Sequence, residues 1–491
     1  MTREIIFACV LSFGGFGGLS WSGLPKKSPI LSVVLSLPIG VAIYTYGSAL
    51  SYSLNVNRPE IGLYVMTGVA LAGFYRGLKE REIRFLDIRV FLSSACMVTL
   101  LMLVTKSVIA PILSYDSYKI VVVGKSFGSS IFSFGSTGLA SFPLMITNFQ
   151  AGGELFNLDY VAYLPAITGL LAIVGATMII SEVVSSSKNQ TVVYSLVALL
   201  VMAIFWAITY MLRSQLGYLN SHMLMAGFYT LGFAFCLNVG KKRQSSLDHS
   251  LCALIVGSIA FIRLEGLLFV SLLLFALMSC KSFSRKQLLT ISAITLVIPA
   301  LWYARLAIAG ASGSTIITSR NTVIMLLVVA SPFVINYWQI TRRITKWMPC
   351  LVVIGLSGIL SIYMLVQDKA VESSLTLISN SVATGYWGAF WWTFGPLVIL
   401  MAIMGPRLNR ESVWLEVLGG GFLLILLLGV IRSSPYRAGW GDSGNRMLVH
   451  LAPLAVLYTL VKVQVCFRRG DEHFTESLPM QSSEELRNDY D

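Results

Sequence analysis

Long apolar runs, each separated from the next by a short polar stretch, recur from the first residues of the chain to about residue 466. Each run approaches the ~20 residues that a helix needs to cross a hydrocarbon core of ~30 Å. Backbone amides inside lipid must find their hydrogen-bond partners within the same segment, so runs of this length are predicted to be helices. The residue-by-residue alternation typical of a membrane barrel is absent from the pattern.

The pattern predicts an all-α, polytopic integral membrane protein with about 15 transmembrane helices. The crossings are expected at 4–21, 29–51, 61–76, 91–113, 160–183, 191–212, 223–240, 248–263, 266–280, 287–308, 321–339, 348–366, 387–405, 412–431 and 447–466. The short pair 248–263 and 266–280 is either two spans or one re-entrant hairpin. The first run is kept as a helix because it lacks the basic region and cleavage site of a signal peptide.

Composition agrees with the pattern. Of 491 residues, 56% are hydrophobic and 12% are charged, whereas soluble domains carry roughly 25% charged residues. Seven cysteines and four histidines are scattered along the chain. Their spacing indicates neither a zinc site nor a disulfide framework.

The net charge of +13 comes from basic clusters in short loops, so nucleic acid is not an expected partner. The positive-inside rule assigns these loops to the cytoplasm. This predicts an external N-terminus, a cytoplasmic C-terminus, a long extracytoplasmic loop at 114–160 and an outer loop at 432–446. Residues 1–469 form the transmembrane domain, and the polar segment 470–491 is predicted to be a disordered cytoplasmic tail. The compact loops suggest the cytoplasmic (inner) membrane of a bacterium.

The long outer loop begins with an acidic and aromatic segment, Ser114–Lys119. A carboxylate hemmed by aromatic rings at a membrane boundary can act as a general base, which makes Asp116 a candidate. The alternative is that Asp116 caps the next helix and that Tyr115 and Tyr118 belong to the interfacial aromatic belt. Rival carboxylates in the outer loops are Glu60, Glu154 and Asp159.

The outer loop 432–446 carries three arginines, Arg432, Arg437 and Arg446. Planar guanidinium groups bind oxyanions through two parallel hydrogen bonds, so they suit a lipid-linked phosphate at the outer membrane face. The alternative is a solvated loop in which Arg437 or Arg446 pairs with Asp442.

Arg263 and Glu265 mark the turn between the two short spans. Residues two apart in a helical turn need not face each other, and a hydrated hairpin tip is one interpretation. Ionisable residues near membrane depth are nonetheless functional candidates.

Together these segments resemble the GT-C superfamily of membrane glycosyltransferases, which use polyprenyl-phosphate-linked sugars. Tyr115–Lys119 followed by Ser141–Pro143 is similar to the outer-loop acidic motif of that family, with Lys119 where family loops often have histidine. Arg263–Gly266 is similar to a mid-chain Arg-x-Glu-Gly turn. Many members place an arginine before a final proline-containing apolar helix, and Asn445–Leu457 resembles that element.

The resemblance implies inverting transfer of a sugar from a polyprenyl-phosphate donor to a cell-envelope glycan or lipid acceptor, by a single displacement at the extracytoplasmic face. Asp116 would be the base. Substrate and phosphate contacts would come from Arg446, Arg437, Arg432, Arg263, Glu265, Tyr118 and Lys119. No cofactor is evident in the sequence, although a lone carboxylate sharing a divalent cation with the substrate phosphate is left open.

Two other classes remain open. An O-antigen polymerase or ligase uses polyprenyl-pyrophosphate glycans and relies on arginine and histidine, without a carboxylate base. A lipid or solute transporter is expected to show symmetry-related repeats and broken helices, and no repeat is visible in this sequence. Sensitivity to the loss of Asp116 separates the glycosyltransferase from the polymerase.

Overall fold

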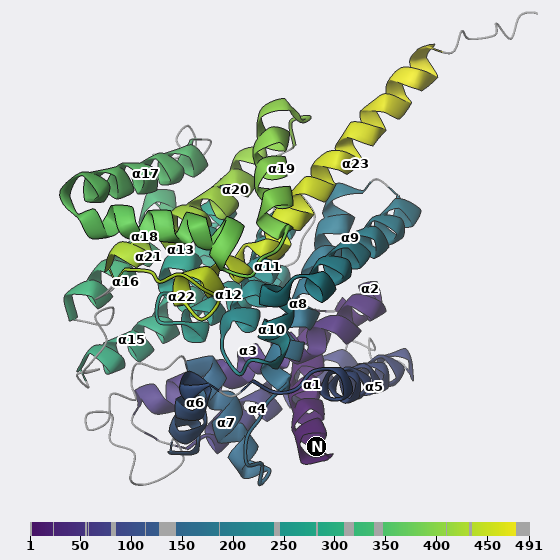
Figure 1. Ribbon diagram of the computed structural model, residues 1–491. Helices are drawn as coiled ribbons and strands as arrows, with labels where there is room; N and C mark the ends of the chain where they lie inside the picture. The colour runs from purple at the N-terminus through teal and green to yellow at the C-terminus, as the bar shows by residue number, and fades with distance from the viewer. Residues whose placement is uncertain are drawn as a thin grey trace, which may run out of the picture.

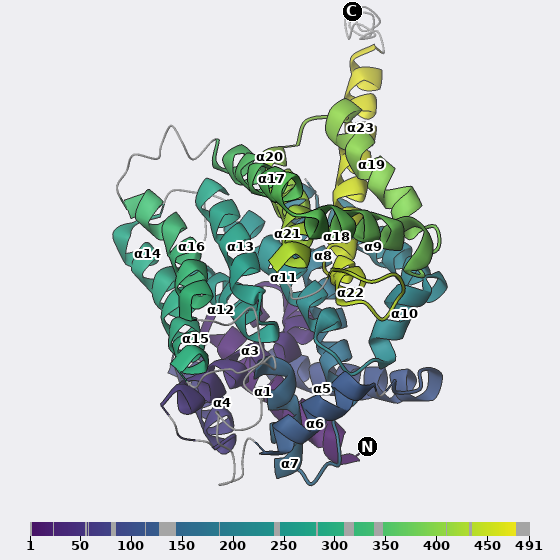
Figure 2. The ribbon, with the colours of Figure 1, turned by 60° about the vertical axis from the view of Figure 1, so that its left-hand side comes forward.

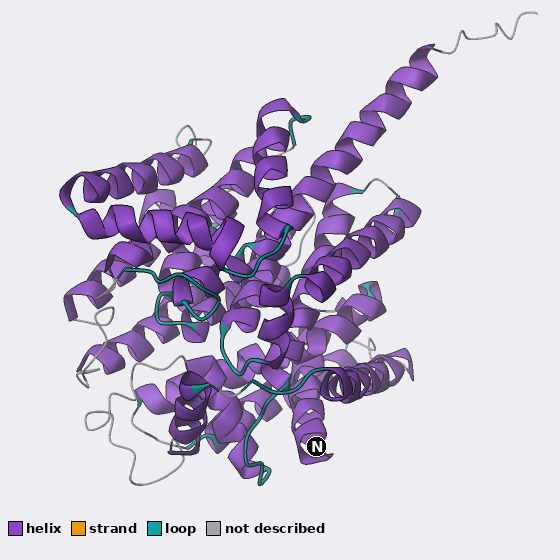
Figure 3. Ribbon diagram, viewed as in Figure 1, coloured by secondary structure: helices purple, strands orange, loops and turns teal. Residues whose placement is uncertain are grey.

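The computed structural model describes residues 2–22, 24–54, 56, 58–79, 85–112, 114–126, 144–185, 187–239, 246–280, 283–308, 319–337, 347–408, 410–431 and 435–477. Helices and short connections make up this part of the chain, and no strand occurs within it (Figure 3). The predicted all-α class is therefore confirmed.

The helices run through the whole described chain (Figure 1). Their bounds are α1 Thr2–Ser22, α2 Leu24–Lys27, α3 Pro29–Ser53, α4 Glu60–Lys79, α5 Phe85–Val108, α6 Tyr115–Ser126, α7 Leu144–Leu155, α8 Leu164–Val184, α9 Lys188–Ile208, α10 Tyr210–Gly217, α11 His222–Val239, α12 Ser246–Ile262, α13 Gly266–Cys280, α14 Arg285–Ser292, η2 Ala293–Val297, α15 Ile298–Ile308, α16 Ser319–Tyr337, α17 Met348–Val366, α18 Asp368–Ser379, η3 Asn380–Thr384, α19 Phe390–Met404, α20 Glu411–Leu415, η4 Glu416–Gly420, α21 Gly421–Ile431, α22 Ser443–Met447, η5 Leu448–His450 and α23 Ala452–Ser477. Of the η elements, η2, η3 and η4 are π-helical and η5 is a 3-10 turn.

Ten of the described helical stretches are long and apolar enough to cross a membrane. Shorter apolar stretches occur at His249–Ile262, Gly266–Cys280, Arg320–Ile335 and Phe390–Met404. A chain with this many membrane-length helices is a multi-pass membrane protein. The total of about fifteen crossings and their direction stay predictions. The start of α1 and the end of α23 lie at opposite ends of the molecule (Figure 2).

The long helices divide into an inner and an outer group. In α11 and α3, 94% and 89% of the most apolar window is buried, against 22% in α9 and 11% in α17. Both kinds of helix are strongly apolar, so the exposed apolar side chains of the outer group need a nonaqueous surrounding, which a bilayer supplies. The inner helices therefore form the core, and α9 and α17 face lipid.

Glycines permit a close backbone approach in this core, between α8 and α11. A Cβ on Gly169 would lie 2.3 Å from the carbonyl oxygen of Met223, and one on Gly227 would lie 2.3 Å from that of Gly169. Small residues at such crossings let the two backbones touch, which is a common way to pack helices in lipid. The contact fixes the first turns of α11, where His222 lies.

Several predicted boundaries differ from the structure. The loop predicted at 114–160 contains helices α6 and α7, and α23 continues to Ser477, inside the predicted tail. The predicted span 191–212 is interrupted at Thr209, whose extended backbone separates α9 from α10. The predicted span 447–466 is likewise divided between η5 and α23.

A buried ion pair ties α20 to α23. The fully buried Lys462 pairs with Glu411 and donates to the carbonyl of Pro406 over 2.8 Å. The hydroxyl of Tyr458 donates to the same carboxylate over 3.0 Å. Each charge thus has several partners, which offsets the cost of removing it from water.

Candidate functional site

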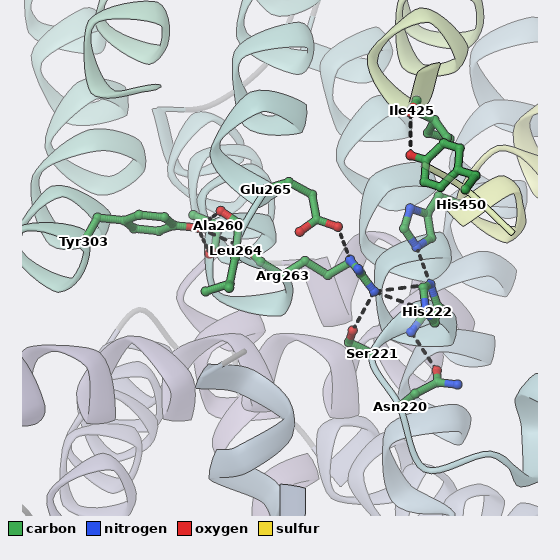
Figure 4. A network of polar contacts seen from close by, with 11 residues as sticks. Asn220, Ser221, His222, Ala260, Arg263, Leu264, Glu265, Tyr303, Ile425 and His450 are labelled. Carbon is green, nitrogen blue, oxygen red and sulfur yellow. Dashed lines mark hydrogen bonds and ion pairs between the residues drawn. The ribbon is translucent and has the colours of Figure 1, made fainter. Parts of the chain in front are cut away.

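Two histidines lie in contact at the centre of the molecule, at the start of α11 and the end of η5. Nδ1 of His222 lies 3.1 Å from Nε2 of His450, and the ring centroids are 5.2 Å apart. Only 2% of His222 and none of His450 is exposed. Figure 4 shows the pair within a wider polar network. Such a network inside an apolar helical core is a candidate functional site.

Arg263 reaches this pair from the turn between α12 and α13 (Figure 4). Its Nη1 lies 3.1 Å from Nε2 of His222 and 3.3 Å from the hydroxyl of Ser221. Its Nε donates to the carboxylate of Glu265. The two charged residues of the turn therefore face each other and point into the core.

The proton positions follow from what each group can do. Arginine only donates, and its Nη1 lies 3.1 Å from Nε2 and 3.4 Å from Nδ1 of His222. In the tautomer that fits the shorter contact, Nε2 accepts from Arg263 and the proton of His222 lies on Nδ1. That proton is then donated to Nε2 of His450, which leaves N–H at Nδ1 of His450. This buried Nδ1 atom has no hydrogen-bond partner within the described structure. A buried donor without an acceptor is costly, and an anionic ligand would satisfy it.

The α12–α13 turn is held from two directions. The hydroxyl of Tyr303 lies within 3.1 Å of three carbonyl oxygens at the end of α12, those of Ala260, Arg263 and Leu264. The hydroxyl has one hydrogen, so it donates to one of these carbonyls at a time, among those that the end of a helix leaves unpaired. On the other side, α13 begins at Gly266, where a Cβ would lie 2.1 Å from the carbonyl oxygen of Ile259.

Replacing Gly266 by alanine is expected to lower the free energy of unfolding by ~1–3 kcal/mol, because the new methyl group overlaps a backbone atom that cannot rotate away. Thermal unfolding in detergent measures the change. Gly355→Ala in α17 is the matched control, since a Cβ there meets nothing within 4 Å. Equal melting temperatures for the two variants would contradict the prediction.

Arg446 reaches the same region from α22 and is 9% exposed. Its Nη1 donates to the hydroxyl of Tyr218 over 2.8 Å, and its guanidinium carbon lies 5.3 Å from the centre of that ring. The hydroxyl of Tyr218 in turn lies 2.7 Å from that of Ser114. Tyr218 therefore connects the arginine to the segment that begins α6.

The start of α6 is fixed to the connection between α10 and α11. The hydroxyl of Ser117 donates to the carbonyl of Leu219 over 3.0 Å, and the amide of Ile112 donates to the carbonyl of Gly217 over 2.7 Å. Asp116 lies on the first turn of this helix, but its side chain lies outside the described part of the structure. The backbone places it between Ser114 and Ser117, which both contact this connection.

The connection itself carries further polar groups. The amide nitrogen of His222 donates to the side chain of Asn220 over 2.8 Å, and Asn220 donates to Gln215 over 2.9 Å. These bonds set the backbone from which His222 projects. Residues 217–222 thus lie between the three segments that the sequence singled out.

The loop before α22 is held by the side chains of Asp442 and Asn445. Asp442 accepts from the amides of Arg437, Gly444 and Asn445. Asn445 also bonds to the indole of Trp387 over 2.6 Å. This framework orients the first turn of α22 and hence Arg446.

The remaining predicted site residues lie further from the centre. Arg437 is exposed on the loop before α22, and Tyr118 is 66% exposed on α6. Lys119 is half-buried on the same helix. Arg432 lies outside the described residues. The structure therefore brings together Arg263, Glu265, Arg446 and the segment of Asp116.

The sequence analysis missed His222, His450 and Tyr218. The two histidines are 228 residues apart, so no spacing in the sequence indicates that they lie in contact. The only available signal was an ionisable side chain within or beside an apolar run. Among the described residues, no group of three or more histidine, cysteine or acidic side chains is placed to hold a metal ion.

Comparison with known proteins adds a distant likeness. No protein-family model and no curated protein matches the chain. Solved structures of the Archaeoglobus fulgidus oligosaccharyltransferase are similar. The form tethered to an acceptor peptide has 16% identity and a TM-score of 0.43, over 73% of this chain and 46% of that one. The complex with an inhibitory peptide and a dolichol-phosphate has 15% identity and a TM-score of 0.42, over 73% and 47%. The chain spans less than half the length of these neighbours, so the proposals below rest on its own residues.

Proposed function

We propose that this protein is a membrane glycosyltransferase that moves a sugar from a polyprenyl-phosphate donor to an acceptor hydroxyl on the extracytoplasmic face. One observation carries the proposal. The buried residues Arg446, His222 and His450 and the partly buried Arg263 form a polar cluster inside a helical membrane protein, and Tyr218 connects this cluster to the segment that bears Asp116. The protein would act in a cytoplasmic membrane of bacterial type.

The charges of the centre suit a phosphate. Arg263 and Arg446 contribute two positive charges and Glu265 one negative charge, which leaves a net charge of +1 when both histidines are neutral. Charge-assisted hydrogen bonds to phosphate are roughly twice as strong as neutral ones. Arg263 and Arg446 would hold the donor phosphate, and the N–H of His450 would add a third donor. Arg437 would contribute from the solvent side of the loop.

The reaction needs one base. The acceptor hydroxyl oxygen bonds to the anomeric carbon of the sugar, and its proton passes to Asp116. The bond from that carbon to the phosphate oxygen breaks, and its electron pair stays on the phosphate. Arg263 and Arg446 stabilise the charge that develops on this oxygen. Because a phosphate is a good leaving group, the site needs no second carboxylate to act as an acid.

Membranes containing the protein are expected to transfer radiolabelled sugar from a polyprenyl-phosphate donor to endogenous glycolipid or glycan. Membranes without it are the control. A panel of polyprenyl-phosphate sugars is tested beside a polyprenyl-pyrophosphate glycan. Transfer from a monophosphate donor supports the proposal, and its absence from every such donor would overturn it.

The histidine pair favours a second candidate, a polymerase or ligase that uses polyprenyl-pyrophosphate glycans. Such an enzyme would use the arginines and histidines for the pyrophosphate and would not need Asp116. Activity that requires a pyrophosphate donor and survives Asp116→Asn would favour it over the glycosyltransferase.

A further inference from the structure

A second feature of the molecule is an apolar cavity between α5, α8, α9 and α10, with a volume of about 670 Å³. This size falls within the ~300–1,000 Å³ of typical ligand pockets. Helices α5 and α9 form two of its walls. In the most apolar 18 residues of each, 28% and 22% of the residues are buried, against 67% in α8. The cavity therefore lies between lipid-facing helices and the core, where a hydrocarbon chain can enter from the bilayer.

Two polar groups interrupt the apolar wall. Arg213 on α10 is the only charged residue among those that line the cavity in the described structure. Trp206 on α9 is 7% exposed, and its indole N–H has no hydrogen-bond partner within the described residues. A cation and a buried donor beside an apolar cavity match a ligand with a hydrocarbon chain and an anionic head.

The rim of the cavity leads to the helix of Asp116. Ile109 and Leu216 line the cavity. The two segments that begin at these residues are joined shortly afterwards by the hydrogen bond between Ile112 and Gly217. The next contact joins Ser114 to Tyr218. The arginine–histidine cluster of Arg263 is reached through the following residues, Ser221 and His222. In this series of contacts the start of α6 lies between the cavity and the cluster.

We propose that this cavity binds the hydrocarbon chain of an anionic membrane lipid, and that this lipid is the acceptor of the transferred sugar. This assignment rests on the proposed function. Arg213 holds the anionic head, and a hydroxyl of the head lies at Asp116. The hydroxyl oxygen bonds to the anomeric carbon, its proton passes to Asp116, and the phosphate of the donor leaves with the electron pair.

The test uses the purified full-length protein in detergent micelles. The probe is phosphatidylglycerol with a diazirine at the end of one acyl chain, which offers both an anionic head and free hydroxyls. Light-driven labelling is mapped to peptides and is expected on α8 and α9 within 170–174 and 199–207. Excess unlabelled phosphatidylglycerol is expected to compete with the probe, and polyprenyl phosphate is not.

Three variants locate the chain. Ala203→Phe, which fills the cavity, is expected to reduce labelling about tenfold, as for the loss of roughly two buried methylene groups. Arg213→Ala is expected to reduce it by up to about fivefold, since an exposed charge contributes modestly. Ile204→Phe, on the same helix and 48% exposed, lies outside the lining and is expected to change nothing.

Binding of radiolabelled polyprenyl phosphate is measured on the same variants. Retained binding in Ala203→Phe, with lost lipid labelling and lost transfer, supports the acceptor assignment. Lost binding in Ala203→Phe, or competition by polyprenyl phosphate, would mean that the cavity holds the donor chain. That outcome overturns this assignment and leaves the proposed function intact. Labelling of the cavity together with transfer to other acceptors but not to phosphatidylglycerol would overturn the acceptor assignment alone. The absence of transfer from every polyprenyl-phosphate donor would overturn the proposed function and, with it, the acceptor role.

Discussion

Sugar transfer is expected to fall about 10²–10⁴-fold when Asp116 is replaced by asparagine, the range that general-base catalysis contributes. The amide keeps the size of the side chain but cannot take the proton of the acceptor hydroxyl. Donor binding is expected to persist, because the proposed phosphate contacts come from Arg263 and Arg446. Transfer from a polyprenyl-phosphate sugar and binding of polyprenyl phosphate, measured on the same preparation, separate the two effects.

The rival carboxylates are the matched controls. Glu154 is 53% exposed and lies 3.7 Å from Lys125, and Asp159 is exposed. Glu154→Gln and Asp159→Asn are therefore expected to retain transfer. Full activity of Asp116→Asn, or loss of activity only in one of the other two, would move the base away from α6.

The helical class could be predicted from the sequence because it depends on local properties. An apolar run of membrane length has few other ways to satisfy its backbone. Interruptions within a run are less visible. Thr209 ends α9 inside a run predicted to continue to residue 212, and the residues around it are as apolar as those before. The short helix α10 that results leads into Tyr218, so this boundary error concealed part of the site.

For the turn with Arg263 and Glu265, the sequence predicts the position of the turn but not the direction of its side chains. The charges at a break between two apolar runs identified the turn. Whether the two side chains would point to solvent or to the core depended on Tyr303 and Gly266, which lie on other elements. Side-chain direction across a turn is set by tertiary contacts, and periodicity carries no information on them.

The histidine pair was beyond sequence reasoning for a related reason. His222 begins α11 after two polar residues, Asn220 and Ser221, whereas His450 ends η5 with apolar residues on both sides along the chain. Their contact is made by the packing of η5 against α11, which the glycine-mediated approach of α8 and α11 supports from the other side. Spacing rules detect ligands that lie close in sequence, and these two do not.

The arginines differ from one another in a way that their sequence positions do not show. Arg446 is 9% exposed and bonded to Tyr218, whereas Arg437 is exposed and held only through its main chain in the contacts described above. Buried charge-assisted bonds are worth more than exposed ones because less water screens them. The burial of each arginine therefore ranks its expected contribution to phosphate binding.

Binding of polyprenyl phosphate is expected to weaken about 10- to 150-fold in Arg263→Ala, which corresponds to the ~1.5–3 kcal/mol of hydrogen bonds to a charged group. The loss of binding in Arg446→Ala is expected to lie in the same range, and Arg437→Ala is expected to change binding by about fivefold or less. Arg320→Ala is the control, since Arg320 is exposed at the start of α16. Binding of the radiolabelled lipid phosphate to protein in detergent gives the affinities.

A conservative variant separates ligand binding from support of the fold. Arg263→Lys keeps the positive charge but loses the planar fork that contacts both Glu265 and His222. Phosphate affinity is expected to recover only in part, and the melting temperature to stay near that of the wild type. Equal phosphate affinity in Arg263→Ala and the wild type would remove Arg263 from the site. A loss in Arg437→Ala larger than in Arg446→Ala would instead place the phosphate at the exposed loop and leave the buried histidine pair a structural role.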